Sequence, residues 1–213
     1  MNFDRTIIRM ARILSTIFRP FYLPVVGFIA LFACTYLRLL PLAYKGEVLL
    51  LIYAYTILTP QITIFAYRKL KGWQRLHLNH RENRSVPYII SIISYMACLY
   101  TLESLHMPRY MGGIIMGALL IQVSCALINI FWKISTHAAG AGGAIGALLA
   151  FSLIFMFNPV MWLCLALLIA GAVDSSRMIL RQHSLGQVLA GTLVGIICGF
   201  WGILLPVPVF FGL

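Results

Sequence analysis

The chain has 213 residues, of which 62% are hydrophobic and 10% are charged, and its formal net charge is +11 at pH 7. A mean hydropathy of +0.95 lies far from that of soluble globular domains, so the composition excludes an ordinary soluble domain and predicts an integral membrane protein. In such a chain, positive charge gives no reason to expect a nucleic-acid partner. Because roughly 20 helical residues cross the hydrocarbon core, we expect one domain with six or seven crossings.

The first twenty residues mix arginines with apolar side chains. Arg5, Arg9, Arg12 and Arg19 alternate with Ile, Leu, Met and Phe at helical spacing. No apolar core followed by a cleavage site is present, so the pattern does not fit a signal peptide. It favours an amphipathic helix over residues 1–20 that lies on an anionic membrane surface.

Seven apolar segments follow, bounded by charges or by Pro and Gly. They predict an all-α, polytopic membrane bundle in which 159–174 is the shortest crossing. The sequence "FNP" at 157–159 fits either a tight hairpin or a break in a buried helix. The segments are 22–42, 48–67, 87–104, 110–131, 138–157, 159–174 and 186–205.

Polar breaks recur after every second crossing. They are residues 68–86, "WKISTH" at 132–137, and the break at 175–185. Two crossings return a chain to the side it left, so all three breaks are expected on one face of the membrane. The opposite face is poor in groups that can do chemistry.

The residues on the first face favour an anionic ligand. Arginine offers a planar fork of donors that matches phosphate oxygens, and histidine can serve as a nucleophile, an acid or a base near neutral pH. Basic residues at helix ends are also common topology signals, and this is the preferred interpretation of 68–75. The polar residues on this face include His77, Arg81, Arg84, Lys133, Ser135, His137, Arg177, Arg181 and His183.

The sequence "SRMILRQH" carries the most specific pattern. Ser176 and Arg177 are followed by five residues and then by His183. This spacing resembles the third signature of the type 2 phosphatidic acid phosphatase superfamily, S-R-x-x-x-x-x-H-x-x-x-D. The resemblance implies that Arg177 binds phosphate and that His183 becomes phosphorylated.

Two earlier breaks resemble the other signatures in the family's order. "STH", with Ser135 and His137, looks like a variant of P-S-G-H, whose histidine protonates the leaving group. "HLNHRENRSVP" at 77–87 looks like a degraded K-x-x-x-x-x-x-R-P, with Arg84 at the arginine and His77 where lysine is expected. "FRPFYLP" and "KISTHAAGAGGAIGA" are similar to stretches in a branch of this superfamily found in Bacteroidetes. The resemblance spans residues 77–187.

This resemblance implies a phosphatase in the bacterial inner (cytoplasmic) membrane. Its substrate would be a phosphomonoester or pyrophosphate of a lipid or polyprenol. His183 would attack phosphorus and His137 would protonate the leaving oxygen. The arginines would stabilise the charge without a cofactor, and no carboxylate pair is present to hold a metal. The expected phosphate-binding residues are Arg84, Arg177, Lys133, Ser135 and His77.

One departure from the family concerns the residue that orients the nucleophile. The family has an aspartate four residues after the histidine, where this chain has Gln187. Glutamine accepts a hydrogen bond but supplies no negative charge. Asp174 is a candidate substitute with a catalytic role, and pairing with Arg177 or Arg181 to fix a helix end is an equally good interpretation of it.

The glycine-rich run at 138–147 invites comparison with a phosphate-binding loop. It lacks the lysine and the strand context of such a loop. Gly142 and Gly146 lie four residues apart in an apolar helix, so close packing of two helices is the preferred interpretation.

Two further functions and two orientations stay open. The same histidine chemistry supports transfer of a phosphorylated headgroup from one lipid to another. Because the signatures match only in part, the sequence also fits a catalytically silent protein that binds or transports a lipid phosphate. The first face carries thirteen of the sixteen basic residues, which predicts the cytoplasmic side. The family resemblance instead implies the periplasmic side.

Overall fold

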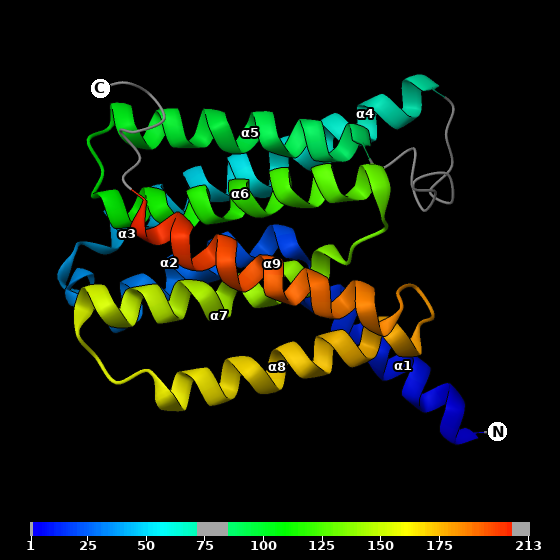
Figure 1. Cartoon of the computed structure of the whole chain (residues 1–213). Helices are drawn as coiled ribbons and strands as arrows, with labels where there is room; N and C mark the ends of the chain where they lie inside the picture. The colour runs from blue at the N-terminus through cyan, green and yellow to red at the C-terminus, as the bar shows by residue number, and fades with distance from the viewer. Residues whose placement is uncertain (1, 72–84, 206–213) are drawn as a thin grey trace.

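The computed structural model describes residues 2–71 and 85–205, and every regular element in these ranges is helical (Figure 1). The all-α prediction is confirmed. Short 3₁₀ turns at Pro20–Tyr22 and Tyr36–Leu39 and a π-helical turn at Ala54–Leu58 join some of the helices. The helices are α1 (Asn2–Ile17), α2 (Leu23–Cys34), α3 (Leu42–Tyr53), α4 (Thr59–Lys71), α5 (Ser85–Ser104), α6 (Arg109–Phe131), α7 (Thr136–Phe155), α8 (Val160–Ile179) and α9 (Leu185–Leu204).

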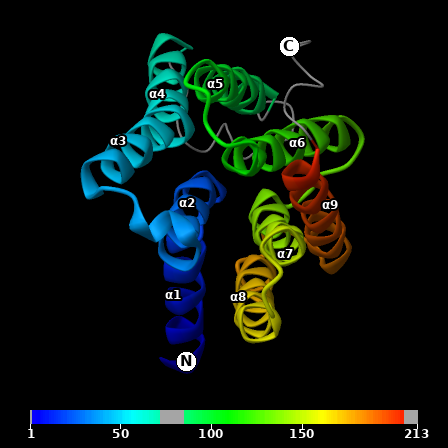
Figure 2. The same cartoon turned by 90° about the vertical axis from the view of Figure 1, so that its left-hand side faces the viewer.

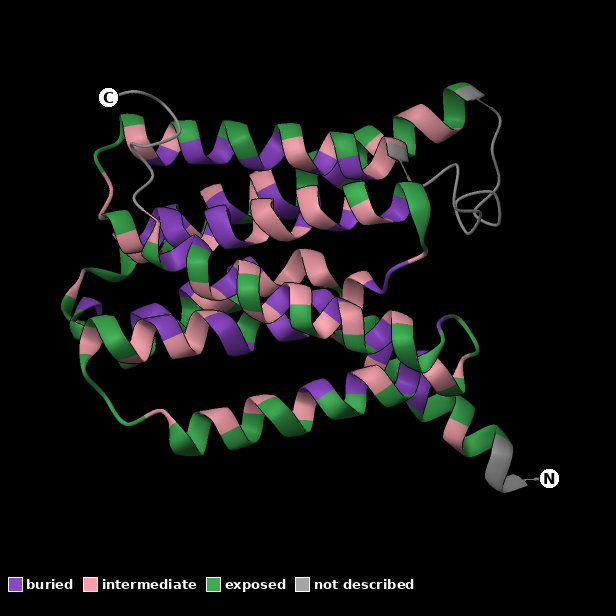
Figure 3. Cartoon of the chain, viewed as in Figure 1, coloured by how far each residue is buried: buried purple, intermediate pink, exposed green. Residues whose placement is uncertain are grey.

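Seven helical stretches in the described ranges are long and apolar enough to cross a membrane, as the sequence predicted. They are Arg5–Cys34, Leu42–Leu70, Val86–Ser104, Arg109–Phe131, Thr136–Phe155, Val160–Ile179 and Leu185–Leu204. Large apolar side chains such as Leu168 and Leu193 point outward, and Figure 3 shows exposed residues along the outer faces of the helices. An apolar exterior of this kind is what lipid contact requires.

The predicted boundaries of the first crossing, 22–42, are wrong. The helix ends at Cys34, and the chain turns through Tyr36–Leu39 before α3 begins. The Thr35 side chain accepts a hydrogen bond from the backbone N–H of Leu37 and so caps this turn. The sequence "FNP" at 157–159 belongs to a tight link between α7 and α8, because Met156 adopts a left-handed conformation and Asn158 Oδ1 accepts a bond from Val160 N. The structure thereby selects the hairpin.

The N-terminal helix α1 leads into α2 through a break at residues 18–19. In Figure 1, α1 slants away from the other helices, in Figure 2 it lies directly below α2, and it packs against the end of α8. Both α1 and α2 lie within the first apolar stretch, Arg5–Cys34. The location of α1 at the membrane surface stays a prediction.

Helices α7 and α9 approach each other through glycine. A Cβ at Gly142 would meet the carbonyl oxygen of Thr192, and one at Gly146 would meet that of Ile196. From the other side, a Cβ at Gly195 would meet the carbonyl oxygen of Ala139. The predicted close packing is confirmed, because backbone touches backbone where a side chain would keep the helices apart.

The polar breaks gather at one end of the bundle, on the right in Figure 1. The links 132–135 and 180–184 lie at this end together with α1, whereas links 35–41, 105–108 and 156–159 lie at the other. The predicted arrangement at one end is therefore confirmed for the second and third breaks, but the predicted start of the third break at 175 is wrong, because α8 continues to Ile179. Residues 72–84 of the first break lie outside the described residues.

Candidate anion site

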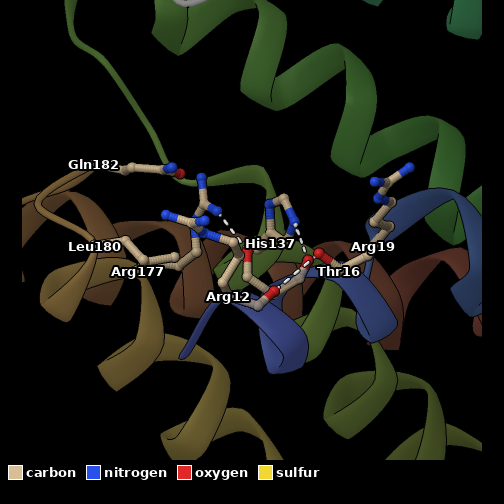
Figure 4. Close-up of a pocket in the computed structure, with 8 residues that line it drawn as sticks. Arg12, Thr16, Arg19, His137, Arg177, Leu180 and Gln182 are labelled. Carbon is tan, nitrogen blue, oxygen red and sulfur yellow. Dashed lines mark hydrogen bonds between the residues drawn. The ribbon is translucent and has the colours of Figure 1, made fainter. Parts of the chain in front are cut away.

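A cavity of about 370 Å³ opens where α1, the start of α7 and the end of α8 meet (Figure 4). Three arginines and one histidine line it, and none of its described lining residues is acidic. Arginine is the side chain best suited to bind a phosphate or carboxylate in two-point geometry. The lining residues are Arg12, Ser15, Thr16, Arg19, His137, Arg177, Leu180 and Gln182.

Two of the predicted site residues meet in this cavity. Arg177 lies in the last turn of α8 and is only 8% exposed, and His137 is the second residue of α7. The α7 helix begins here because Ser135 caps it, its Oγ accepting a hydrogen bond from Ala138 N at 3.4 Å. His137 therefore lies at the positive end of the α7 dipole, which favours an anion beside it.

Ser15 of α1 contacts both residues. Its hydroxyl accepts a hydrogen bond from Arg177 Nη1 at 2.6 Å, and its carbonyl oxygen lies 3.2 Å from His137 Nε2. Because a carbonyl oxygen only accepts, Nε2 of His137 carries the hydrogen in this arrangement. Ser15 thus contacts the two donors that the sequence predicts for other roles: Arg177, expected to bind phosphate, and His137, expected to protonate the leaving group.

His183 lies in the link between α8 and α9 and is 8% exposed. It is not among the residues that line the cavity, although its neighbour Gln182 is. His137 is within electrostatic range of His183, Arg177 and Arg19. His183 Nδ1 lies 3.1 Å from Oε1 of Gln187, so the residue at the family's aspartate position does contact the predicted nucleophile.

Asp174 points toward α9. Its Oδ2 accepts a hydrogen bond from Thr192 Oγ1 at 2.9 Å, and its Oδ1 is buried without a partner among the described residues. Asp174 lies one turn before Arg177 on α8 and does not line the cavity. This placement makes Asp174 a polar contact between α8 and α9.

The described residues among the other predicted phosphate-binding residues lie in the link before α7 and do not line the cavity. Ser135 is buried, and its backbone N–H donates to the carbonyl oxygen of Gln187 at 3.3 Å. Lys133 is half-buried in the same link, and neither residue lines the cavity. His77 and Arg84 lie outside the described residues. No group of three His, Cys, Asp or Glu side chains that could hold a metal ion occurs in the part of the chain that the structure describes.

The sequence interpretation missed the contribution of α1. Arg12 and Ser15 lie about one turn apart on α1, and Arg19 follows two residues after the end of this helix. A polar residue such as Ser15 within an arginine stripe was a usable signal for a second role. An interfacial helix has the same arginine pattern, so the sequence alone predicts contact of Arg12 and Arg19 with lipid headgroups.

Comparison with known proteins adds no assignment: no family model matches the chain, and neither curated proteins nor solved structures provide a match. A function for this chain is therefore inferred from the residues of the site and from the resemblance of their spacing to the phosphatase signatures.

Proposed function

We propose that this protein is a membrane phosphatase that removes phosphate from a lipid or polyprenyl phosphate through a phosphohistidine. The observation that carries the proposal is that His137 and Arg177, which lie in stretches resembling two different signatures, line one cavity with two further arginines. The absence of acidic residues from its described lining suits a phosphate better than a cation.

The proposed roles follow from the donors and acceptors. Arg177 binds phosphate oxygens and stabilises the charge that spreads over them during transfer. His183 is the proposed nucleophile and attacks phosphorus with Nε2, a role that requires the link carrying it to move toward the cavity beside Gln182. His137 gives the proton on Nε2 to the leaving oxygen, and water then hydrolyses the phosphohistidine.

The second candidate function is a catalytically silent protein that binds a lipid phosphate without hydrolysing it, and one observation favours it. His183 is buried outside the cavity lining, and its partner Gln187 is neutral. A neutral partner orients a histidine without stabilising the positive charge that the histidine gains on phosphorylation. A binder would keep the arginines of the cavity and lose turnover.

The proposed function includes a membrane and a side of that membrane on which the cavity lies. We place the protein in the bacterial inner membrane, where a lipid tail stays in the bilayer while its phosphate reaches the cavity. The positive-inside rule applied to the basic residues at this end supports a cytoplasmic site.

The test measures inorganic phosphate released by purified protein in a neutral detergent. Suitable substrates are phosphatidic acid, phosphatidylglycerol phosphate, undecaprenyl diphosphate and lipid A. We expect release from at least one of them and its loss in His183→Ala, together with an acid-labile phosphoprotein in the wild type that the variant lacks. His106→Ala, which changes a histidine at the opposite end of the bundle, is the matched control. An active His183→Ala protein rejects the mechanism, and tight binding without release identifies the binder.

A further inference from the structure

The cationic groups of the cavity lie on both sides of His137. Figure 4 shows Arg12 and Arg177 on one side of the imidazole and Arg19 on the other, with all three side chains directed to the same side of the ribbon. Arg177 and Arg19 are both within electrostatic range of His137. The site therefore has two cationic ends with an acid–base group between them.

Arg12 and Arg19 are available to a ligand. Both are exposed, and neither guanidinium makes a hydrogen bond or an ion pair with another side chain within 2–71 and 85–205. The cavity volume of about 370 Å³ is roughly twelve times the ~30 Å³ that a water molecule occupies in the liquid. It has room for more than one phosphoryl group.

Charge indicates the number of phosphoryl groups. Three guanidinium groups line the cavity, and a guanidinium is always protonated in proteins. A phosphate monoester carries at most two negative charges, whereas a diphosphate ester carries up to three. The diphosphate matches the three arginines in charge, and it offers one phosphoryl group to each cationic end of the site.

We infer that the cavity selects a lipid diphosphate over the corresponding monophosphate, with Arg19 holding the phosphoryl group on the lipid side. This inference rests on the proposed function. Arg177 and Arg12 hold the terminal phosphoryl group, and the bridging oxygen lies beside His137. A bound phosphoryl oxygen replaces the Ser15 hydroxyl as the acceptor for Arg177 Nη1.

The transfer is balanced in atoms and electrons. His183 Nε2 forms a bond to the terminal phosphorus, and the bond from that phosphorus to the bridging oxygen breaks. The bridging oxygen keeps the electron pair and takes the proton of His137, so the lipid monophosphate leaves. Water then attacks the phosphohistidine and gives a proton to His137. The P–N electron pair returns to His183, and inorganic phosphate is released.

The test compares one polyprenyl chain carrying a diphosphate or a monophosphate, in phosphatidylcholine nanodiscs. For the wild type we expect kcat/KM on the diphosphate to exceed that on the monophosphate by at least tenfold. Arg19→Ala removes a charge-assisted contact made to only one of the substrates, so the ratio should fall about tenfold. Arg9→Ala is the matched control, because it removes another exposed arginine, which lies on α1 and does not line the cavity. An unchanged ratio in Arg19→Ala overturns the inference, as does an equal fall in Arg9→Ala.

A second arm separates the diphosphate from a neighbouring anionic lipid as the group that Arg19 binds. The measurements are repeated with phosphatidylglycerol in the nanodiscs. If Arg19→Ala acts only when the anionic lipid is present, and acts equally on both substrates, Arg19 binds a separate headgroup and the inference is wrong.

Measuring the Kd of each lipid separates a failure of the diphosphate subsite from a failure of the proposed phosphatase activity. If the wild type hydrolyses neither substrate, the phosphatase proposal fails. The Kd values of the two lipids for the wild type and Arg19→Ala then decide the subsite. A preference for the diphosphate that Arg19→Ala removes supports the subsite, and equal Kd values overturn it.

Discussion

Gln187 holds His183 in one tautomer. Oε1 of Gln187 lies 3.3 Å from the backbone N–H of Ser184, which can only donate, so this atom acts as an acceptor. The same oxygen lies 3.1 Å from His183 Nδ1, which must therefore carry the hydrogen of this contact. Nε2 is left with the lone pair that a nucleophile needs when the ring is neutral.

The first prediction concerns this contact. Gln187→Leu removes the acceptor at similar size, so His183 loses its preferred tautomer and we expect kcat to fall about a hundredfold. Gln187→Glu keeps the side-chain length and adds a negative charge that stabilises a positively charged ring, so kcat should hold or rise. Phosphate release under saturating lipid measures both. Equal kcat values for Gln187→Leu and the wild type would show that Gln187 only caps α9.

The arrangement of His183 and Gln187 could be predicted in part from the sequence. "SLGQ" at 184–187 fits the S-x-x-Q pattern of a helix start, and a residue four positions after His183 can contact it across one turn. The all-α bundle, the seven stretches of membrane-spanning length in the described residues and the shared end of two polar breaks followed from hydropathy and parity. These features depend on local pattern and on the thickness of the membrane.

The docking of α1 could not be predicted, because an arginine stripe has the same spacing whether it faces headgroups or a cavity. The end of the first apolar helix at Cys34 could not be predicted either. Residues 35–42 include four leucines beside Arg38 and Pro41, so they could be read as the end of the crossing, whereas the break depends on the Thr35 cap, which hydropathy does not report.

The second prediction separates the roles of Arg177 and His183. Arg177→Ala removes the charge-assisted donors, so both binding of lipid phosphate and turnover should weaken, each by at least tenfold. His183→Ala removes the attacking nitrogen, so turnover should vanish while Kd changes less than threefold. Equilibrium binding and phosphate release are measured on the same preparations. If Kd stays unchanged in Arg177→Ala, phosphate is bound elsewhere.

The third prediction concerns Ser15, which joins α1 to the site. Ser15→Ala deletes the acceptor that Arg177 Nη1 uses, and losing a hydrogen bond to a charged group costs about 1.5–3 kcal/mol. We therefore expect a lower Tm without ligand and a larger rise in Tm on addition of inorganic phosphate than in the wild type, because phosphate supplies the missing acceptor.

Thr16→Val is the control for Ser15. Thr16 is exposed, and among the described residues its hydroxyl bonds only the carbonyl oxygen of Arg12, one turn back on α1. Its loss should change stability by less than about 0.5 kcal/mol. If Ser15→Ala behaves in the same way as Thr16→Val, the Ser15 hydroxyl does not hold α1 on the cavity.

The last prediction tests the glycine contact that sets the distance between α7 and α9. A Cβ at Gly195 would meet the carbonyl oxygen of Ala139, and backbone atoms cannot move aside as a flexible side chain can. Gly195→Ala should therefore lower stability by about 1–3 kcal/mol, the usual cost of overpacking. It should also lower turnover, because the bond from Ser135 N to the Gln187 carbonyl oxygen ties the link before His137 to the helix after His183.

Gly171→Ala is the control, since a Cβ there meets nothing within 4 Å. In that variant Tm should hold or rise, because alanine favours helix by up to about 1 kcal/mol. Thermal unfolding in detergent measures both variants, and equal Tm values would show that α7 and α9 can separate without cost.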